Sequence, residues 1–248
     1  MMGKRYKNPP VIEALCEFQF ESTASWDLAI PGIIYDQVKQ DFPKRLQASR
    51  LTVDISPVGE KSPRISSSPI TQFWSEDDTF LIQIGENLLS VNHLKPYTSW
   101  NTFLPMIRNI FNIYRNIAAP ERLHGTTLRY INRFEFADRD KDVNDYFELR
   151  PHIGFKLPKE LSGFAVIVQI PFEEAQGMLN VHVGTAIGMF PNSRSIINLD
   201  LAYSLVTSKA ALLDNTVDWL ENAHKHIEDT FEACITDTLK QTFEERAE

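Results

Sequence analysis

Two short stretches of this chain read almost alike, and their likeness constrains the fold more than any other feature. Residues 10–20 are PVIEALCEFQF, and residues 126–136, which lie 116 positions later, are TTLRYINRFEF. Apolar side chains alternate with other side chains in the first stretch, which is the period of a β-strand with one buried face. A strand that recurs at mid-chain predicts an internal duplication.

The elements expected after each stretch follow the same order. Each half predicts a strand, a helix, a meander of three or four strands, and a second helix. Pro31 suits a first helical turn and Pro43 ends that helix. The remaining expectations are strands between 50 and 94, a helix capped by Ser99 with Pro105 inside it, a short helix at 140–149, strands at 163–171, 178–188 and 195–205, and a long helix at 217–245 capped by Asn215.

This order predicts an α+β fold. We expect two α+β halves, 1–120 and 121–248, that form one continuous domain. The arrangement resembles the fold of the TATA-binding protein, in which one curved antiparallel sheet carries helices on a single face. A START-like or helix-grip arrangement has similar parts and is the alternative. Likeness of fold carries no function.

The two similar strands differ in charge. Glu13 and Glu17 lie on one face of the first, and Arg129 and Arg133 occupy the matching positions of the second. If these strands pair, the carboxylates can meet the guanidinium groups across the sheet. Each such pair would stabilise by about 0.2–1 kcal/mol. We therefore predict inter-repeat ion pairs between Glu13 and Glu17 on one strand and Arg129 and Arg133 on the other.

The charge of the chain is uneven. The net charge of −8 argues against broad nucleic-acid affinity. Ten acidic and three basic residues lie between 211 and 248, whereas the segment 101–133 has five arginines and one glutamate. The acidic C-terminal helix predicts an electrostatic docking surface for a protein partner. The residues proposed for this surface are Glu221, Glu228 and Glu232.

The sequence carries no catalytic or cofactor signature. The motifs HExxH, GxSxG, GxxxxGK[ST] and GxGxxG are all missing from it. Cys16 and Cys234 lie too far apart in sequence for a metal-binding pair, so we expect two buried thiols. No apolar run approaches the length of roughly 18–20 residues that spans a membrane. We therefore predict a cytoplasmic protein that is not an enzyme and holds no metal or cofactor.

A polar cluster in the second strand leaves a different interpretation open. Tyr130 and Asn132 share a face with apolar residues, and a buried asparagine needs hydrogen-bond partners. Asn132 either fixes sheet–helix packing or lines a pocket. In the second case a small-molecule-binding or enzymatic domain would have its pocket between the sheet and the long C-terminal helix. Its lining would be Tyr130, Asn132, Arg133 and His182.

Three motifs carry a resemblance over essentially the whole chain. KNPPVIEALCEFQF, SVNHLKPYTSW and LRYINRFEF resemble a sporadically distributed family of bacterial proteins of similar length and unknown function. The resemblance implies a bacterial cytoplasmic protein and transfers no catalytic residues. Sporadic distribution implies an accessory role such as phage defence or toxin neutralisation. We expect a binding or regulatory protein with a protein partner, allow for a homodimer, and rank nucleic-acid binding last.

Overall fold

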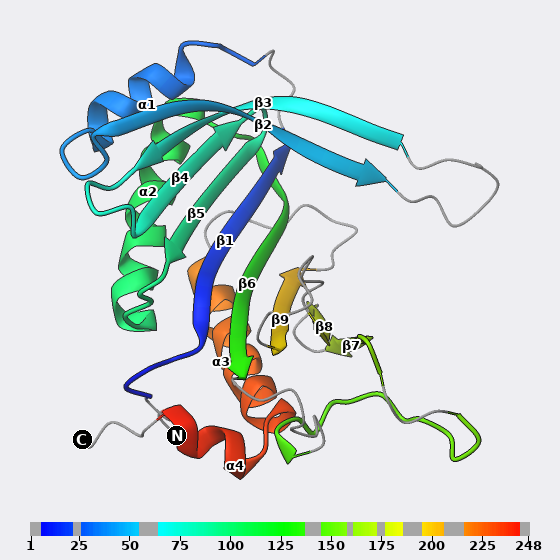
Figure 1. Cartoon of the computed structure of the whole chain (residues 1–248). Helices are drawn as coiled ribbons and strands as arrows, with labels where there is room; N and C mark the ends of the chain where they lie inside the picture. Colours follow the sequence, from blue (N-terminus) through cyan, green and yellow to red (C-terminus); the bar gives the residue numbers. More distant parts are fainter. Residues whose placement is uncertain are drawn as a thin grey trace.

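One curved, antiparallel sheet of nine strands organises the chain in the computed structural model (Figure 1). Residues 6–21, 26–54, 64–136, 145–157, 161–172, 177–185, 195–205 and 216–243 are described. The strands are β1 (Val11–Glu21), β2 (Lys44–Asp54), β3 (Arg64–Trp74), β4 (Phe80–Gly85), β5 (Leu88–Leu94), β6 (Arg122–Phe136), β7 (Ala165–Phe172), β8 (Gly177–Thr185) and β9 (Ser195–Leu205).

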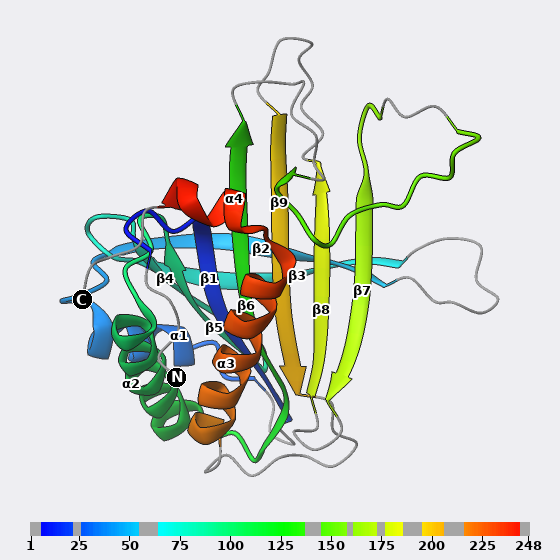
Figure 2. The ribbon, with the colours of Figure 1, turned by 90° about the horizontal axis from the view of Figure 1, so that it is seen from below.

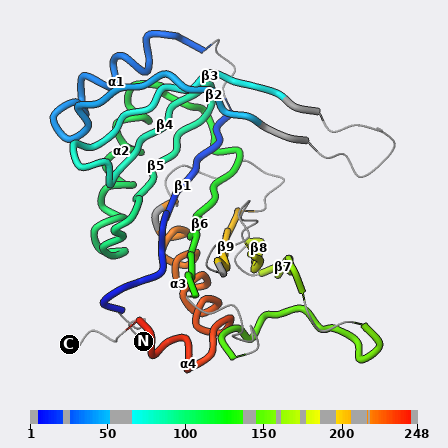
Figure 3. Tube along the Cα trace, in the orientation of Figure 1, coloured from blue at the N-terminus to red at the C-terminus, as the bar shows by residue number. Residues whose placement is uncertain are grey.

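The two similar strands, β1 and β6, pair at the centre of this sheet, which is the condition that the predicted inter-repeat ion pairs required. Figure 3 shows them side by side, β1 in blue and β6 in green. Outward from β1 come β5, β4, β3 and β2, and outward from β6 come β9, β8 and β7. The order is therefore symmetrical about the central pair apart from β2. The duplication itself stays a prediction.

The helices gather on one face of the sheet (Figure 2). The predicted α+β fold with a curved antiparallel sheet is confirmed, and the sheet is not closed into a barrel. The helices are α1 (Ile30–Val38), α2 (Trp100–Ala118), α3 (Thr216–Cys234), α4 (Asp237–Lys240) and the short 3-10 helix η3 (Gln241–Phe243).

The central helix α2 shows why its sequence forms a helix against the sheet. Ser99 caps its start, as predicted, because its side chain accepts a hydrogen bond from the Thr102 amide. Its apolar residues recur at helical spacing and are buried. Phe111 lies 4.6 Å, ring to ring, from Phe18 of β1. The buried residues of α2 are Phe103, Leu104, Ile107, Ile110, Phe111 and Tyr114.

The helical face of the sheet forms the core. Ala14, Cys16 and Phe18 alternate along β1 and are fully buried, which confirms the expected period. Burial raises the pKa of Cys16 well above its usual range and that of Cys234 to about 11. Both cysteines are buried and free, so the expectation of two buried thiols is confirmed.

Two predicted helices differ in length from the structure. The first ends at Val38, one turn earlier than expected. The long C-terminal helix breaks after Cys234 because Ile235 forms a β-bridge with Phe147, and Thr236 then caps α4 with its side chain. The predicted helix at 140–149 lies partly outside the described residues, and its described part, 145–149, is not an α-helix, since Phe147 takes part in that β-bridge. The predicted cap Asn215 lies wholly outside the described residues.

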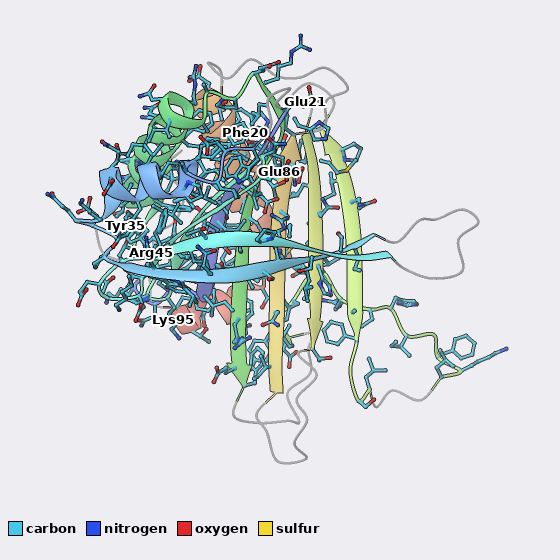
Figure 4. All side chains as sticks on the ribbon, turned by 90° about the horizontal axis from the view of Figure 1, so that it is seen from above. Phe20, Glu21, Tyr35, Arg45, Glu86 and Lys95 are labelled. Atoms are coloured by element: carbon cyan, nitrogen blue, oxygen red, sulfur yellow. The ribbon has the colours of Figure 1, made fainter. Side chains whose placement is uncertain are left out.

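The paired strands β2 and β3 extend over the face of the sheet that carries no helices. Figure 4 shows them crossing the longer strands of the second half at a steep angle. We call this hairpin the β2–β3 arm (residues 44–54 and 64–74). Near its base the Arg45 guanidinium lies 5.3 Å from the ring centre of Tyr35, and both residues are labelled in Figure 4. The arm therefore projects across the helix-free side of the sheet and stands apart from β7, β8 and β9 (Figure 1).

Candidate functional site

The helix-free face of the sheet carries a row of polar side chains at its centre. Successive side chains of a strand point to opposite faces. The residues before and after Glu17 and Thr127 are buried against the helices, so Glu17 and Thr127 point to the helix-free face. The register places Glu17 opposite Thr127, and Thr127 opposite Ser204. The Thr127 and Ser204 hydroxyl oxygens lie 2.9 Å apart. Polar side chains thus form a row across β1, β6 and β9.

Two adjoining cavities hollow this face. The first has a volume of about 340 Å³ and the second about 360 Å³. Glu17 and Thr127 line both, so the cavities adjoin along β1, β6 and β9, and we call the two together the sheet groove. Its lining residues are Leu15, Glu17, Gln19, Arg50, His124, Gly125, Thr126, Thr127, Arg129, Asn180, His182, Asp200, Ala202, Ser204 and Leu205.

An ion pair fastens the β2–β3 arm over the sheet groove. Arg50 of β2 donates two hydrogen bonds to the Glu17 carboxylate of β1, at 2.8 and 3.0 Å. The Arg50 side chain is 35% exposed and that of Glu17 is 18% exposed. A bidentate, half-buried pair of this kind holds its geometry better than an exposed pair does. Arg50 therefore both lines the groove and ties the arm to it.

Replacing Arg50 with alanine should release the arm. We expect faster amide hydrogen exchange in β2 and β3, and a loss of about 1 kcal/mol in the free energy of unfolding. Hydrogen exchange followed by mass spectrometry measures the first effect. Leu51→Ala is the matched control, because Leu51 follows Arg50 in β2 and its side chain is 68% exposed. Equal exchange rates in the two variants would contradict the claim that the ion pair between Arg50 and Glu17 holds the arm in place.

A second ion pair forms the floor of the groove. The Arg129 guanidinium of β6 donates two hydrogen bonds to Asp200 of β9, one of them from Nε at 2.8 Å. Hydrogen bonding to Asp200 raises the pKa of Arg129. His182 of β8 lies directly opposite Asp200 in the register. The groove therefore presents two guanidinium groups, each already neutralised by a carboxylate.

The predicted ion pairs between β1 and β6 do not form as direct contacts, although Glu13 and Glu17 both act on Arg129 at longer range and help to raise its pKa. The register sets Glu13 opposite Ile131 and Glu17 opposite Thr127, so neither carboxylate faces an arginine directly. The direct ion pairs of Glu17 and Arg129 reach other strands, since Glu17 binds Arg50 and Arg129 binds Asp200. The remaining two residues make hydrogen bonds, from the Asn92 amide to Glu13 at 2.6 Å and from Arg133 to the Asn198 side chain at 3.3 Å.

A series of side-chain amide hydrogen bonds extends the polar face across the first half of the sheet. It runs from Gln72 of β3 through Gln83 of β4 and Asn92 of β5 to Glu13 of β1, with distances of 3.1, 3.4 and 2.6 Å. Asn92 is only 2% exposed, so its hydrogen bonds offset the cost of burying an amide. Sequence reasoning missed this series of hydrogen bonds, although the alternation of side chains along β4 and β5 places these residues on one face.

The predicted pocket between sheet and helix does not assemble. Tyr130 and Asn132 are buried on the helical face, whereas Arg133 and His182 belong to the opposite face. The Tyr130 hydroxyl oxygen lies 3.0 Å from that of Tyr97, and the Asn132 amide donates to the Leu199 carbonyl at 3.1 Å. Asn132 therefore serves packing, and of the four residues His182 alone lines the sheet groove.

Aromatic rings fill the space that this pocket would have occupied. His224 of α3 stacks on Trp100 of α2 at 4.2 Å between ring centres. Its ring centre lies 5.8 Å from that of Tyr130. His224 is 9% exposed, and burial lowers its pKa to about 4. A neutral histidine in an aromatic layer is a packing residue here.

The three acidic residues predicted to face a partner all contact other parts of the chain. Glu221, Glu228 and Glu232 lie on α3 with side chains 52%, 42% and 28% exposed. Their role as a partner surface stays a prediction, because these contacts leave each carboxylate partly accessible. The contacts are 2.9 Å from Trp100 Nε1 to Glu221, 3.8 Å from His224 Nδ1 to Glu228, and 2.6 Å from the Tyr6 hydroxyl to Glu232.

Comparison with known proteins adds no assignment, since no family model and no curated protein matches the chain. Within the described ranges, no group of three or more His, Cys, Asp or Glu side chains could hold a metal ion. None of the helices in those ranges is both long enough and apolar enough to cross a membrane. The sheet groove is therefore the candidate site, on geometry alone.

Proposed function

We propose that this chain is a non-enzymatic binding protein that receives an extended segment of a protein partner in the sheet groove. The observation that carries the proposal is that two cavities adjoin at Glu17 and Thr127, one after the other along the strands. A depression that follows the strands suits a polypeptide in extended conformation, whereas small ligands favour enclosed and mostly apolar pockets. The β2–β3 arm then covers one side of the bound segment.

The chemistry of the groove supports a polypeptide over other ligands. Arg50 and Arg129 are each paired with a carboxylate, so the groove offers no net positive charge to a phosphate backbone. Hydroxyl and amide groups such as those of Thr127 and Asn180 offer donors and acceptors to a peptide main chain. We also propose the bacterial accessory role, on the resemblance alone.

The substitution Thr127→Trp tests the proposal, because an indole at this position would fill the junction of the two cavities. Peptides selected from a random display library on the wild-type protein should bind Thr127→Trp at least about tenfold more weakly, a loss of roughly 1.4 kcal/mol. Asn109→Trp, on the exposed side of α2, is the control and should bind them as the wild type does. Peptides that bind Thr127→Trp equally well, or the absence of any enriched peptide, would contradict the proposal.

A further inference from the structure

The two edges of the sheet differ sharply in chemistry. The edge strand β2 has the sequence KRLQASRLTVD, with three basic residues and one aspartate, whereas β7 reads AVIVQIPF and has no charge. Edge strands that must stay unpaired are usually protected by charge, because their free backbone groups accept another strand. The β7 edge lacks this protection along its whole length.

Exposed apolar side chains concentrate in β7 and in the stretch of sequence that precedes it. Of the nine large hydrophobic side chains exposed in the described ranges, five fall within residues 155–170, in β7 and the segment that leads into it. Ile167, near the middle of β7, is 69% exposed. Monomeric proteins seldom gather exposed apolar residues in this way unless they contact a partner. These five residues are Phe155, Leu157, Leu161, Ile167 and Ile170.

The backbone of β7 presents its free groups symmetrically about Ile167. The Thr185 amide donates to the Phe164 carbonyl at 3.0 Å, and the Phe164 amide donates to Thr185 Oγ1 at 3.0 Å. Phe164 thus directs its polar groups toward β8, and alternation directs those of Ala165, Ile167 and Gln169 to the open edge. Pro171 has no amide hydrogen, and it ends the run of donors four residues beyond Ile167.

We propose that β7 pairs with β7 of a second copy of this chain, antiparallel and with Ile167 on the two-fold axis. In this register Ala165 of each copy faces Gln169 of the other, and the two Ile167 side chains meet. An uncharged strand can pair with itself without like-charge repulsion. Such a contact is isologous and closed, so it makes a dimer and no filament. The sheet then runs continuously through both copies, and each copy keeps its own sheet groove.

The substitution Ile167→Lys tests the dimer by setting two ammonium groups against each other at the axis. Analytical ultracentrifugation should find the wild type as a dimer, and Ile167→Lys should raise the dissociation constant by about 100-fold. Leu51→Lys is the matched control, because Leu51 is 68% exposed on the opposite edge strand and should leave the dimer unchanged. Circular dichroism would show that both variants keep their secondary structure.

A cysteine variant keeps the test decisive should Ile167→Lys fail to fold. Facing Cα atoms of a hydrogen-bonded antiparallel pair lie about 5.5 Å apart, within reach of a disulfide. Oxidised Ile167→Cys should therefore form a covalent dimer, while Leu51→Cys should not, and the native Cys16 and Cys234 are buried. A monomeric wild type, an Ile167→Lys variant that stays dimeric, or equal cross-linking of the two cysteine variants would overturn the proposal.

Discussion

Gly177→Ala should lower the free energy of unfolding by about 3 kcal/mol, because it adds a carbon where there is no room. A Cβ atom at this position would lie 2.1 Å from the Tyr203 hydroxyl oxygen and 2.2 Å from its Cζ. Tyr203 cannot move aside easily, since it is fully buried and stacks on His226 at 5.1 Å between ring centres. Urea denaturation measures the loss as a lower midpoint with an unchanged slope.

Gly32→Ala is the control for this substitution. No atom lies within 4 Å of the position that a Cβ would take at Gly32, which sits inside α1. Alanine there should raise the free energy of unfolding by up to about 1 kcal/mol through helix propensity. A Gly177→Ala protein as stable as the wild type would mean that Tyr203 does not pack against the start of β8.

Acidification from pH 7 to pH 4 should cost about 3 kcal/mol of stability through His224 alone. Burial lowers the pKa of this residue to about 4, below the ordinary value of 6.5 that it regains on unfolding. Between these two values the unfolded chain binds more protons than the folded chain, so stability falls as the pH falls. Glu228 Oε2, 3.8 Å from Nδ1, favours the protonated ring, and the desolvation of the ring outweighs it.

The variant His224→Phe isolates this contribution. Phenylalanine keeps an aromatic ring against Trp100 but has no proton to bind, so its stability should depend less steeply on pH between 4 and 6.5. Urea denaturation at several pH values gives the two slopes. Comparing the two slopes removes the contributions of groups far from His224, which are common to both proteins. Identical slopes for variant and wild type would show that His224 is not held neutral in the folded state.

Much of the sheet could be predicted from the sequence, because a strand with one buried face has a period that can be read directly. The alternation of Ala14, Cys16 and Phe18 located β1 and its helical face. The same rule of alternation, applied to Arg133, would have separated it from Tyr130 and Asn132 and excluded the predicted pocket. That error was avoidable without coordinates.

The partners of the groove residues could not be predicted, because they depend on how far the sheet curves. Arg50 is 33 positions from Glu17, and Asp200 is 71 positions from Arg129. Neither contact can be predicted from neighbouring residues. The alternation of a strand predicts which face a side chain is on, but it does not predict how the β2–β3 arm bends. Glu17 does pair with an arginine, as predicted, but that arginine is Arg50 of β2 and not a residue of β6.

The central claim is that a protein partner lies in the sheet groove, and site-specific photo-cross-linking tests it most directly. A photoreactive amino acid would be placed at Thr127 in the groove and, in a second variant, at Asn109 on the exposed side of α2. In cells of the source organism we expect one prominent cross-linked protein from position 127 and none from position 109. Cross-links from position 109 alone, or no partner at position 127, would contradict the claim.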